Sequence, residues 1–256
     1  MKKFIQKFYI RYIRSKIKNE IARQRLKLLL WDVYGYYPLL FTKTIGFADR
    51  WTLMKKCIAV DWNIVHAHKP CELVPILISI LDKKQNEQNS VAPVIVEAGC
   101  WLGGSSSKFS LACALAGYKL HIYDSFAGVE YGDPSVSEAY FYGTYVGEEE
   151  VVKNNIKKYG DISVCEFHKG WFIDTFKDFA MPAKVVYIDC DLRKGTLEVI
   201  EATKPYMIKG GKIYTQDYHI PSIKEALNDK STWEKLNIIP PVVEKLKRNT
   251  AVINCS

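Results

Sequence analysis

A glycine-rich turn after a short apolar segment constrains the fold more than any other feature of this chain. Residues 94–96 are Val-Ile-Val, a composition typical of a buried parallel strand. The next residues, 97–105, are EAGCWLGGS and lead into an apolar helix. A second short apolar segment, 120–123, is followed by an acid, Asp124. This order of strand, glycine turn, helix and acid-tipped strand predicts a nucleoside site at the carboxyl edge of an α/β sheet.

The glycine spacing indicates which nucleoside is bound. Dinucleotide-binding loops use G-x-G-x-x-G, whereas the glycines here are Gly99, Gly103 and Gly104. A carboxylate at the strand tip, Glu97, would repel a pyrophosphate but suits a cationic amino-acid ligand such as S-adenosylmethionine. Its ammonium could meet carbonyls near Gly99, and its carboxylate could meet Ser105 at the helix N-terminus. A glycine loop alone is equally compatible with a simple tight turn.

Further expectations concern the rest of the donor pocket. We expect Asp124 to accept hydrogen bonds from both ribose hydroxyls, with Ser125 beside it. Trp101 either shields the sulfonium or fills space beneath the loop. His168 lies next to the predicted adenine end and His121 falls within a strand, so we interpret both as structural or cofactor-side residues.

Alternating strand and helix patterns predict the architecture. The strands are expected at 94–96, 120–123, 163–167, 184–188, 212–215 and 251–254. The helices are expected at 45–68, 73–83, 148–159, 173–179, 196–207 and 222–227, with a turn at 209–211. Together they predict an α/β protein with a doubly wound, mostly parallel, seven-stranded Rossmann-like sheet and an added helical N-terminal region. The predicted divisions are an arm at 1–30, a helical extension or substrate cap at 31–90, and a nucleoside-binding domain at 91–256.

Basic residues are concentrated in the arm. Residues 1–30 contain ten Lys or Arg and one acid, a net charge of +9, whereas the whole chain carries +8. Apolar and aromatic residues recur at helical spacing within it, which predicts a basic amphipathic helix. Contact with a membrane surface and docking on a partner or second subunit are both open, and nucleic-acid binding is disfavoured because the basic residues stop at the arm. Seven scattered cysteines without metal-site spacing indicate a reducing cytoplasm, and no apolar run reaches the length of a membrane span.

Acids also follow the later strands. Asp189 and Asp191 come directly after one predicted strand, and Gln216 and Asp217 after the next. Because the carboxyl ends of parallel strands share an edge, these groups should meet, and Mg²⁺ is the hard cation that such oxygens prefer. Without a metal, a base must remove the acceptor proton, and Asp189, Asp191 and His219 are the candidates.

Six short segments occur in an order that one known family shares. They are VEAGCWLGGS at 96–105, DSFAG at 124–128, GE to KKYG at 147–160, FHKGWFIDT at 167–175, YIDCDL at 187–192 and GG to DY at 210–218. Through them the chain resembles the macrolide-sugar O-methyltransferases of the macrocin and mycinamicin type, which are class I S-adenosylmethionine-dependent enzymes. The resemblance covers about residues 92–228.

The resemblance implies roles for individual residues. Glu97, Gly99 and Ser105 would hold the methionine end of the donor, and Asp124 the ribose. The adenine would lie against Gly170, Trp171 and Phe172. Asp189 with Gln216 and Asp217 would hold a divalent metal and the substrate diol. The family pattern has two acids where this chain has Gln216-Asp217, and an aromatic where Arg193 stands, so metal dependence is left open.

The sequence therefore predicts a methyltransferase that acts on a sugar hydroxyl of a glycan or glycosylated natural product. The basic arm further predicts that the glycan is lipid-linked and lies at the inner surface of a membrane. The apolar N-terminal helices predict a homodimer. Three alternatives remain at this point: a catechol or phenol O-methyltransferase, a nicotinamide-dependent oxidoreductase, and a binding module that has lost its chemistry.

Overall fold

The computed structural model describes residues 20–82, 92–131 and 138–255, so most of the predicted basic arm lies outside the described residues. One seven-stranded sheet runs through the centre, in the order β3-β2-β1-β4-β5-β7-β6. Its strands are β1 Val94–Ala98, β2 Leu120–Asp124, β3 Cys165–Lys169, β4 Ala183–Ile188, β5 Met207–Thr215, β6 Val243–Lys245 and β7 Ala251–Asn254. The predicted α/β sheet class is confirmed.

The first five strands run parallel, and β7 inserts antiparallel between β5 and β6. The chain leaves β1 toward β2 and β3, then returns to place β4 on the other side of β1. This reversal creates a switch point at the carboxyl ends of β1 and β4, where ligands of open α/β sheets bind.

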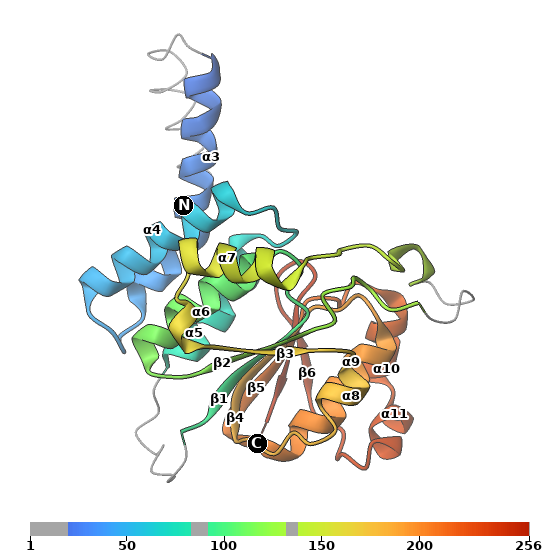
Figure 1. Cartoon of the computed structure of the whole chain (residues 1–256). Helices are drawn as coiled ribbons and strands as arrows, with labels where there is room; N and C mark the ends of the chain where they lie inside the picture. The colour runs from blue at the N-terminus through green and yellow to red at the C-terminus, as the bar shows by residue number, and fades with distance from the viewer. Residues whose placement is uncertain (1–19, 83–91, 132–137, 256) are drawn as a thin grey trace.

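Helices cover both faces of the sheet (Figure 1). One face carries α3 Glu20–Tyr36, α4 Phe47–Asn63, α5 Pro70–Leu81, α6 Gly104–Ala116 and α7 Glu149–Tyr159. The other carries α8 Phe172–Thr175, α9 Arg193–Thr203, α10 Pro221–Asn228 and α11 Lys230–Lys235. Short 3₁₀ turns are η2 Tyr37–Phe41, η3 Ala139–Phe141, η4 Ile162–Val164 and η5 Lys204–Tyr206. No helix within the described ranges is long and apolar enough to cross a bilayer.

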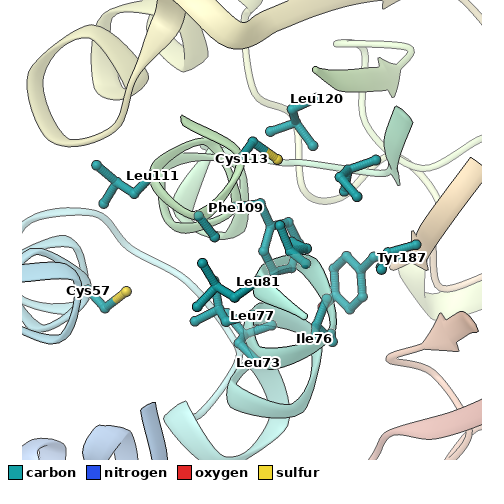
Figure 2. Packing of buried hydrophobic residues seen from close by; sticks show 14 of the residues in the cluster. Cys57, Leu73, Ile76, Leu77, Leu81, Phe109, Leu111, Cys113, Leu120 and Tyr187 are labelled. Carbon is teal, nitrogen blue, oxygen red and sulfur yellow. The ribbon is translucent and has the colours of Figure 1, made fainter. Parts of the chain in front are cut away.

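The first core cluster joins the N-terminal helices to the sheet (Figure 2). In it Phe109 of α6 meets Tyr187 of β4 edge-on, with ring centroids 5.2 Å apart. Helix α5, which belongs to the predicted 31–90 extension, contributes fully buried side chains such as Leu73 and Leu77. Burying a leucine or phenylalanine contributes about 1.5–3 kcal/mol. The sheet thus depends on helices from the N-terminal region for its core.

Several predicted element boundaries were wrong. The helix expected at 45–68 ends at Asn63, and the helix expected at 196–207 ends at Thr203. The expected turn at 209–211 lies inside β5, because Gly210, at a φ of +75°, lets the strand pass through an irregular register shift beside β4. The expected helix at 173–179 is one turn long in α8. Strand β6 and helix α11 were not predicted individually, since both are short and partly exposed.

Candidate active site

The carboxyl ends of the five parallel strands surround a cavity of about 210 Å³. It opens between the glycine turn after β1, the acid at the end of β2, and the segments that follow β4 and β5. Residues 65–68, between α4 and α5, close one side, and Phe141 and Tyr145 of the loop after β2 close another. The predicted site residues that line it are Gly99, Trp101, Asp124, Ser125, Gly170, Trp171, Phe172, Asp189, Asp191, Gln216, Asp217 and His219.

The glycine turn brings two strand tips into contact. Gly99 has a φ of +90°, and a Cβ there would lie 1.9 Å from the carbonyl oxygen of Asp189. Only glycine allows this approach, so the tips of β1 and β4 can meet at the switch point. Trp101 also has a positive φ, 47°, and its ring meets Tyr145 edge-on at 5.1 Å.

Asp124 organises the nucleoside side of the cavity. Its Oδ2 accepts a hydrogen bond from the Cys100 amide and its Oδ1 one from the Phe126 amide, both at 2.7 Å. An ionised carboxylate has about four acceptor positions, so capacity remains for a vicinal diol. Ser125 donates a hydrogen bond from its hydroxyl to the Gly128 carbonyl at 2.9 Å. Its hydroxyl therefore stabilises the turn after β2. This acceptor set fits the ribose of S-adenosylmethionine.

Three predicted donor-binding residues lie outside the cavity lining. Gly103 is the N-cap residue of α6, and Glu97 and Ser105 are 0% and 1% exposed behind the turn. Neither carboxylate oxygen of Glu97 makes a hydrogen bond of good geometry to the described residues. Burial raises the pKa of Glu97 to about 8, which the nearby hydroxyls of Ser105 and Ser106 only partly oppose. Direct contact of Glu97, Gly103 and Ser105 with the donor stays a prediction.

Aromatic residues form the far end of the nucleoside side. The Gly170 amide donates to the Asp124 carbonyl at 3.0 Å, which continues the β2–β3 pairing past the strand ends. Trp171 and Phe172 follow directly and line the cavity, with Trp171 38% exposed. Their flat surfaces suit an adenine ring.

The acids after β4 and β5 form one cluster. Oδ2 of Asp217 accepts from the amides of Cys190 and Asp191, at 3.0 and 2.9 Å. The Tyr187 hydroxyl lies 3.1 Å from Oδ2 of Asp189. Burial, followed by repulsion between the acids, raises the pKa values of Asp191 and Asp217, and burial raises that of Asp189. Repulsion between these acids would favour a bound cation such as Mg²⁺, but the described residues do not bring their ligand atoms together as a ready metal site.

Gln216 fits a metal less well than the acids do. Its Oε1 lies 3.2 Å from the Tyr187 hydroxyl, and its Nε2 donates to Oε1 of the buried Glu72 at 3.2 Å. The side chain is therefore already paired on both ends. Gln216 as a metal ligand stays a prediction.

Comparisons with known proteins agree with this geometry. The family model for macrocin O-methyltransferases (TylF) matches residues 81–244, which is more than half of the chain. The chain belongs to the macrocin O-methyltransferase family. This membership supports S-adenosylmethionine as the group that the Asp124 side of the cavity accepts.

One curated relative of this macrocin-type chain is also named as an O-methyltransferase. A Streptomyces olivaceus protein, 8-demethyl-8-(2,3-dimethoxy-alpha-L-rhamnosyl)-tetracenomycin-C 4'-O-methyltransferase, is 29% identical over 147 residues. That match spans 53% of this chain and 56% of the relative, so the chain covers about half the length of this curated relative.

Two solved structures share the fold. The O-methyltransferase NovP has a TM-score of 0.57 at 20% identity, covering 84% of this chain and 82% of its own. The calicheamicin methyltransferase CalS11 has a TM-score of 0.53 at 14% identity, covering 94% and 95%. At such identities the likeness supports the fold alone.

The macrocin-type site contains histidines that the sequence left without a role. His66 and His68 lie on the segment between α4 and α5, with their rings stacked at 5.2 Å, and both line the cavity. His68 is 6% exposed, its Nδ1 lies 3.6 Å from Oδ2 of Asp189, and burial lowers its pKa well below the ordinary value. His219, the predicted candidate base, is exposed and lines the same cavity. The His-x-His spacing was visible in the sequence, but its position opposite Asp189 was not.

A buried ionic network holds this histidine segment. Asp61 of α4 pairs with Lys108 of α6 and with Nε2 of His66 at 2.9 Å, and it accepts from the Tyr36 hydroxyl at 2.8 Å. The side chains of Lys108 and Asp61 are 1% and 7% exposed. Burial alone would raise the pKa of Asp61, yet His66 and Lys108 hold it below its ordinary value. The network fixes one wall of the active site to the fold.

Replacing Lys108 with Met is expected to lower the free energy of unfolding by about 3–5 kcal/mol, because it leaves a buried carboxylate without its main cation. Since the lowered pKa of Asp61 marks stability that is lost as the pH falls through it, the deficit should shrink in acid. Urea unfolding at several pH values measures this. The double variant Lys108→Met with Asp61→Asn should recover part of the loss. If its loss in unfolding free energy equals the sum of the losses of the two single variants, the pairing is contradicted.

Proposed function

We propose that this chain transfers the methyl group of S-adenosylmethionine to a hydroxyl of a sugar, on a glycosylated natural product or glycan. The observation that carries the proposal is the convergence, in one cavity, of a ribose acceptor at Asp124 and an acid cluster at Asp189 and Asp217. The family membership supports the same chemistry, and the Streptomyces olivaceus relative is named as a methyltransferase of a rhamnosyl-bearing compound.

The chemistry asks two things of the protein. A sulfonium already activates its methyl group, so the site must align the acceptor oxygen in line and assist the loss of its proton. Asp189 is our proposed proton acceptor or hydroxyl orienter, with Asp191, His219 and His68 as further candidates within the same cavity. Bound Mg²⁺, held by Asp189 and Asp217 with Gln216 beside them, would supply acidity to the hydroxyl.

The charge of the cavity favours an acceptor rich in hydroxyls. Among the described lining residues six carry carboxyl groups and none is Lys or Arg. A pyrophosphate would meet no cation there, which also argues against a nicotinamide dinucleotide. A sugar diol instead can donate hydrogen bonds to the carboxylates. Aromatic rings of Trp101, Phe141 and Tyr145 can stack on either a sugar face or a phenol, so catechols belong in the test.

The test is methyl transfer from labelled S-adenosylmethionine to a panel of glycosides, glycans and catechols, each with and without EDTA. We expect labelled product with a glycoside and none with a catechol. Donor binding is measured separately by calorimetry with S-adenosylhomocysteine and with NADH. Heat with NADH but none with S-adenosylhomocysteine would overturn the proposal, and so would product from catechols alone.

We further propose that the basic arm makes peripheral contact with an anionic membrane surface and that the acceptor there is lipid-linked. The support is the net charge of +9 in residues 1–30. Deleting residues 1–19, which leaves α3 in place, should abolish co-sedimentation with anionic vesicles while donor binding persists. Unchanged co-sedimentation would remove this proposal. A homodimer and a cytoplasmic location also remain proposals; the seven free thiols support a reducing compartment, and sedimentation velocity measures the oligomeric state.

A further inference from the structure

Three potential metal ligands meet on the sheet face opposite the α5–α6 layer. His121 lies on β2, while Glu166 and His168 lie on the neighbouring edge strand β3. Register pairs His121 with Glu166 and Tyr123 with His168, so the side chains share one face. One ligand atom from each of the three lies within 4.8 Å of the others. None of the three lines the active-site cavity.

The two imidazoles face each other at short range. Nδ1 of His121 lies 2.9 Å from Nε2 of His168, and the other ring nitrogen of His121, Nε2, lies 3.7 Å from Oε2 of Glu166. A single ion can use only one of these two His121 nitrogens. At 2.9 Å the two nitrogens either share a proton in a hydrogen bond or enclose a small ion after a slight separation. Zn–N distances of about 2.0–2.1 Å put two nitrogens of a tetrahedral site about 3.3 Å apart. The two nitrogens would therefore have to separate by a few tenths of an ångström to hold the ion.

Neighbouring rings fix this arrangement in advance. His168 stacks on Tyr123 with centroids 4.1 Å apart, and Tyr123 stacks in turn on Phe176 at 3.9 Å. His121 is 5% exposed and cannot turn into solvent. A site whose ligands are already oriented loses little entropy when an ion binds.

The charges around the cluster also favour a cation. An imidazole can offer one ring nitrogen lone pair to a metal ion, so His121 and His168 supply one nitrogen ligand each. The carboxylate of Glu166 is half-exposed and gives the cluster a net negative charge. Lys119 is a nearby positive charge that opposes a bound cation, but its ammonium is engaged by the Ser163 carbonyl, to which it donates at 3.0 Å.

We infer that His121, Glu166 and His168 form a binding site for a borderline divalent transition-metal ion, with Zn²⁺ as its natural occupant. Two imidazoles and one carboxylate are a ligand set that zinc accepts, with the fourth position open to water beside the exposed Glu166. Oxygen-preferring Mg²⁺ would instead select the acid cluster at the strand tips. A bound ion would fasten edge strand β3 to β2, whose ends carry Gly170 and Asp124 of the donor pocket.

The test uses the full chain, freed of metal by dialysis against a chelator, with excess Mg²⁺ present to occupy the oxygen site. Zn²⁺ is titrated by calorimetry, and Co²⁺ binding is followed by visible absorption, which is strong only for tetrahedral sites. We expect one Zn²⁺ per chain, a rise in Tm, and an intense Co²⁺ band. His121→Gln and His168→Phe, the latter retaining the stack on Tyr123, should each weaken Zn²⁺ binding at least about tenfold.

Two further variants keep the inference falsifiable if the buried substitutions perturb folding. Glu166→Gln changes only a half-exposed side chain and should weaken binding and alter the Co²⁺ spectrum. The control Glu201→Gln, on the exposed side of α9, should do neither. Absence of Zn²⁺ binding by the unaltered protein would overturn the inference. Wild-type affinity in both folded histidine variants would also overturn it, because the ion would then sit elsewhere.

Discussion

Replacing Asp189 with Asn is expected to lower the rate of methyl transfer by about 10²–10⁴-fold, the range that a positioned proton acceptor contributes. Asp189 lies where β1, β4 and the histidine segment meet, with the Tyr187 hydroxyl 3.1 Å and His68 Nδ1 3.6 Å from its Oδ2. The amide keeps the shape of the side chain but neither accepts the hydroxyl proton nor contributes a negative charge to a cation. Single-turnover transfer from labelled S-adenosylmethionine measures the loss.

Stability and donor binding distinguish a chemical loss from a folding defect. Burial raises the pKa of Asp189, so its ionisation is unfavourable in the folded state and its contribution to stability falls as the pH rises. The Asn variant should therefore melt at or above the Tm of the metal-free parent at neutral pH. It should also keep its affinity for S-adenosylhomocysteine. A variant that retains full transfer activity would exclude Asp189 from the chemistry and direct attention to Asp191, His219 or His68.

Replacing Asp124 with Ala should weaken the binding of S-adenosylhomocysteine by about 10- to 100-fold, because a hydrogen bond to a charged group contributes about 1.5–3 kcal/mol. The same change leaves the amides of Cys100 and Phe126 without their acceptor, so the glycine turn loses its anchor. Calorimetric titration gives the affinity directly, and saturating donor should restore part of the transfer rate.

A matched exposed acid provides the control for this variant. Asp178, after α8, is exposed and does not line the cavity, so Asp178→Asn should bind the donor as the parent does. Equal affinities for the parent and the Asp124→Ala protein would place the ribose elsewhere. The whole assignment of the donor side would then fail.

The sequence predicted the bounds of the buried strands best. Strands β1, β2 and β4 begin and end within two residues of the predicted bounds, because buried parallel strands have a continuous apolar signature. The turn predicted at 209–211 from its glycines was wrong, because the positive φ of Gly210 belongs to an irregular part of strand β5. Glu97 and Ser105 match the donor-binding motif in residue type, but the fold buries both side chains behind the turn.

The sequence by itself determined the class of sheet and the gathering of Asp124, Asp189 and Asp217 on one edge, because the carboxyl ends of parallel strands share that edge whatever covers them. Only the tertiary structure decided what covers them. Glu72 reaches Gln216 across 144 residues, and His68 reaches Asp189 from the segment before α5. Hydrophobic periodicity gives the buried face of a helix but not the neighbour it packs on, so those long-range contacts are set by the packing of α4, α5 and α6 over the sheet.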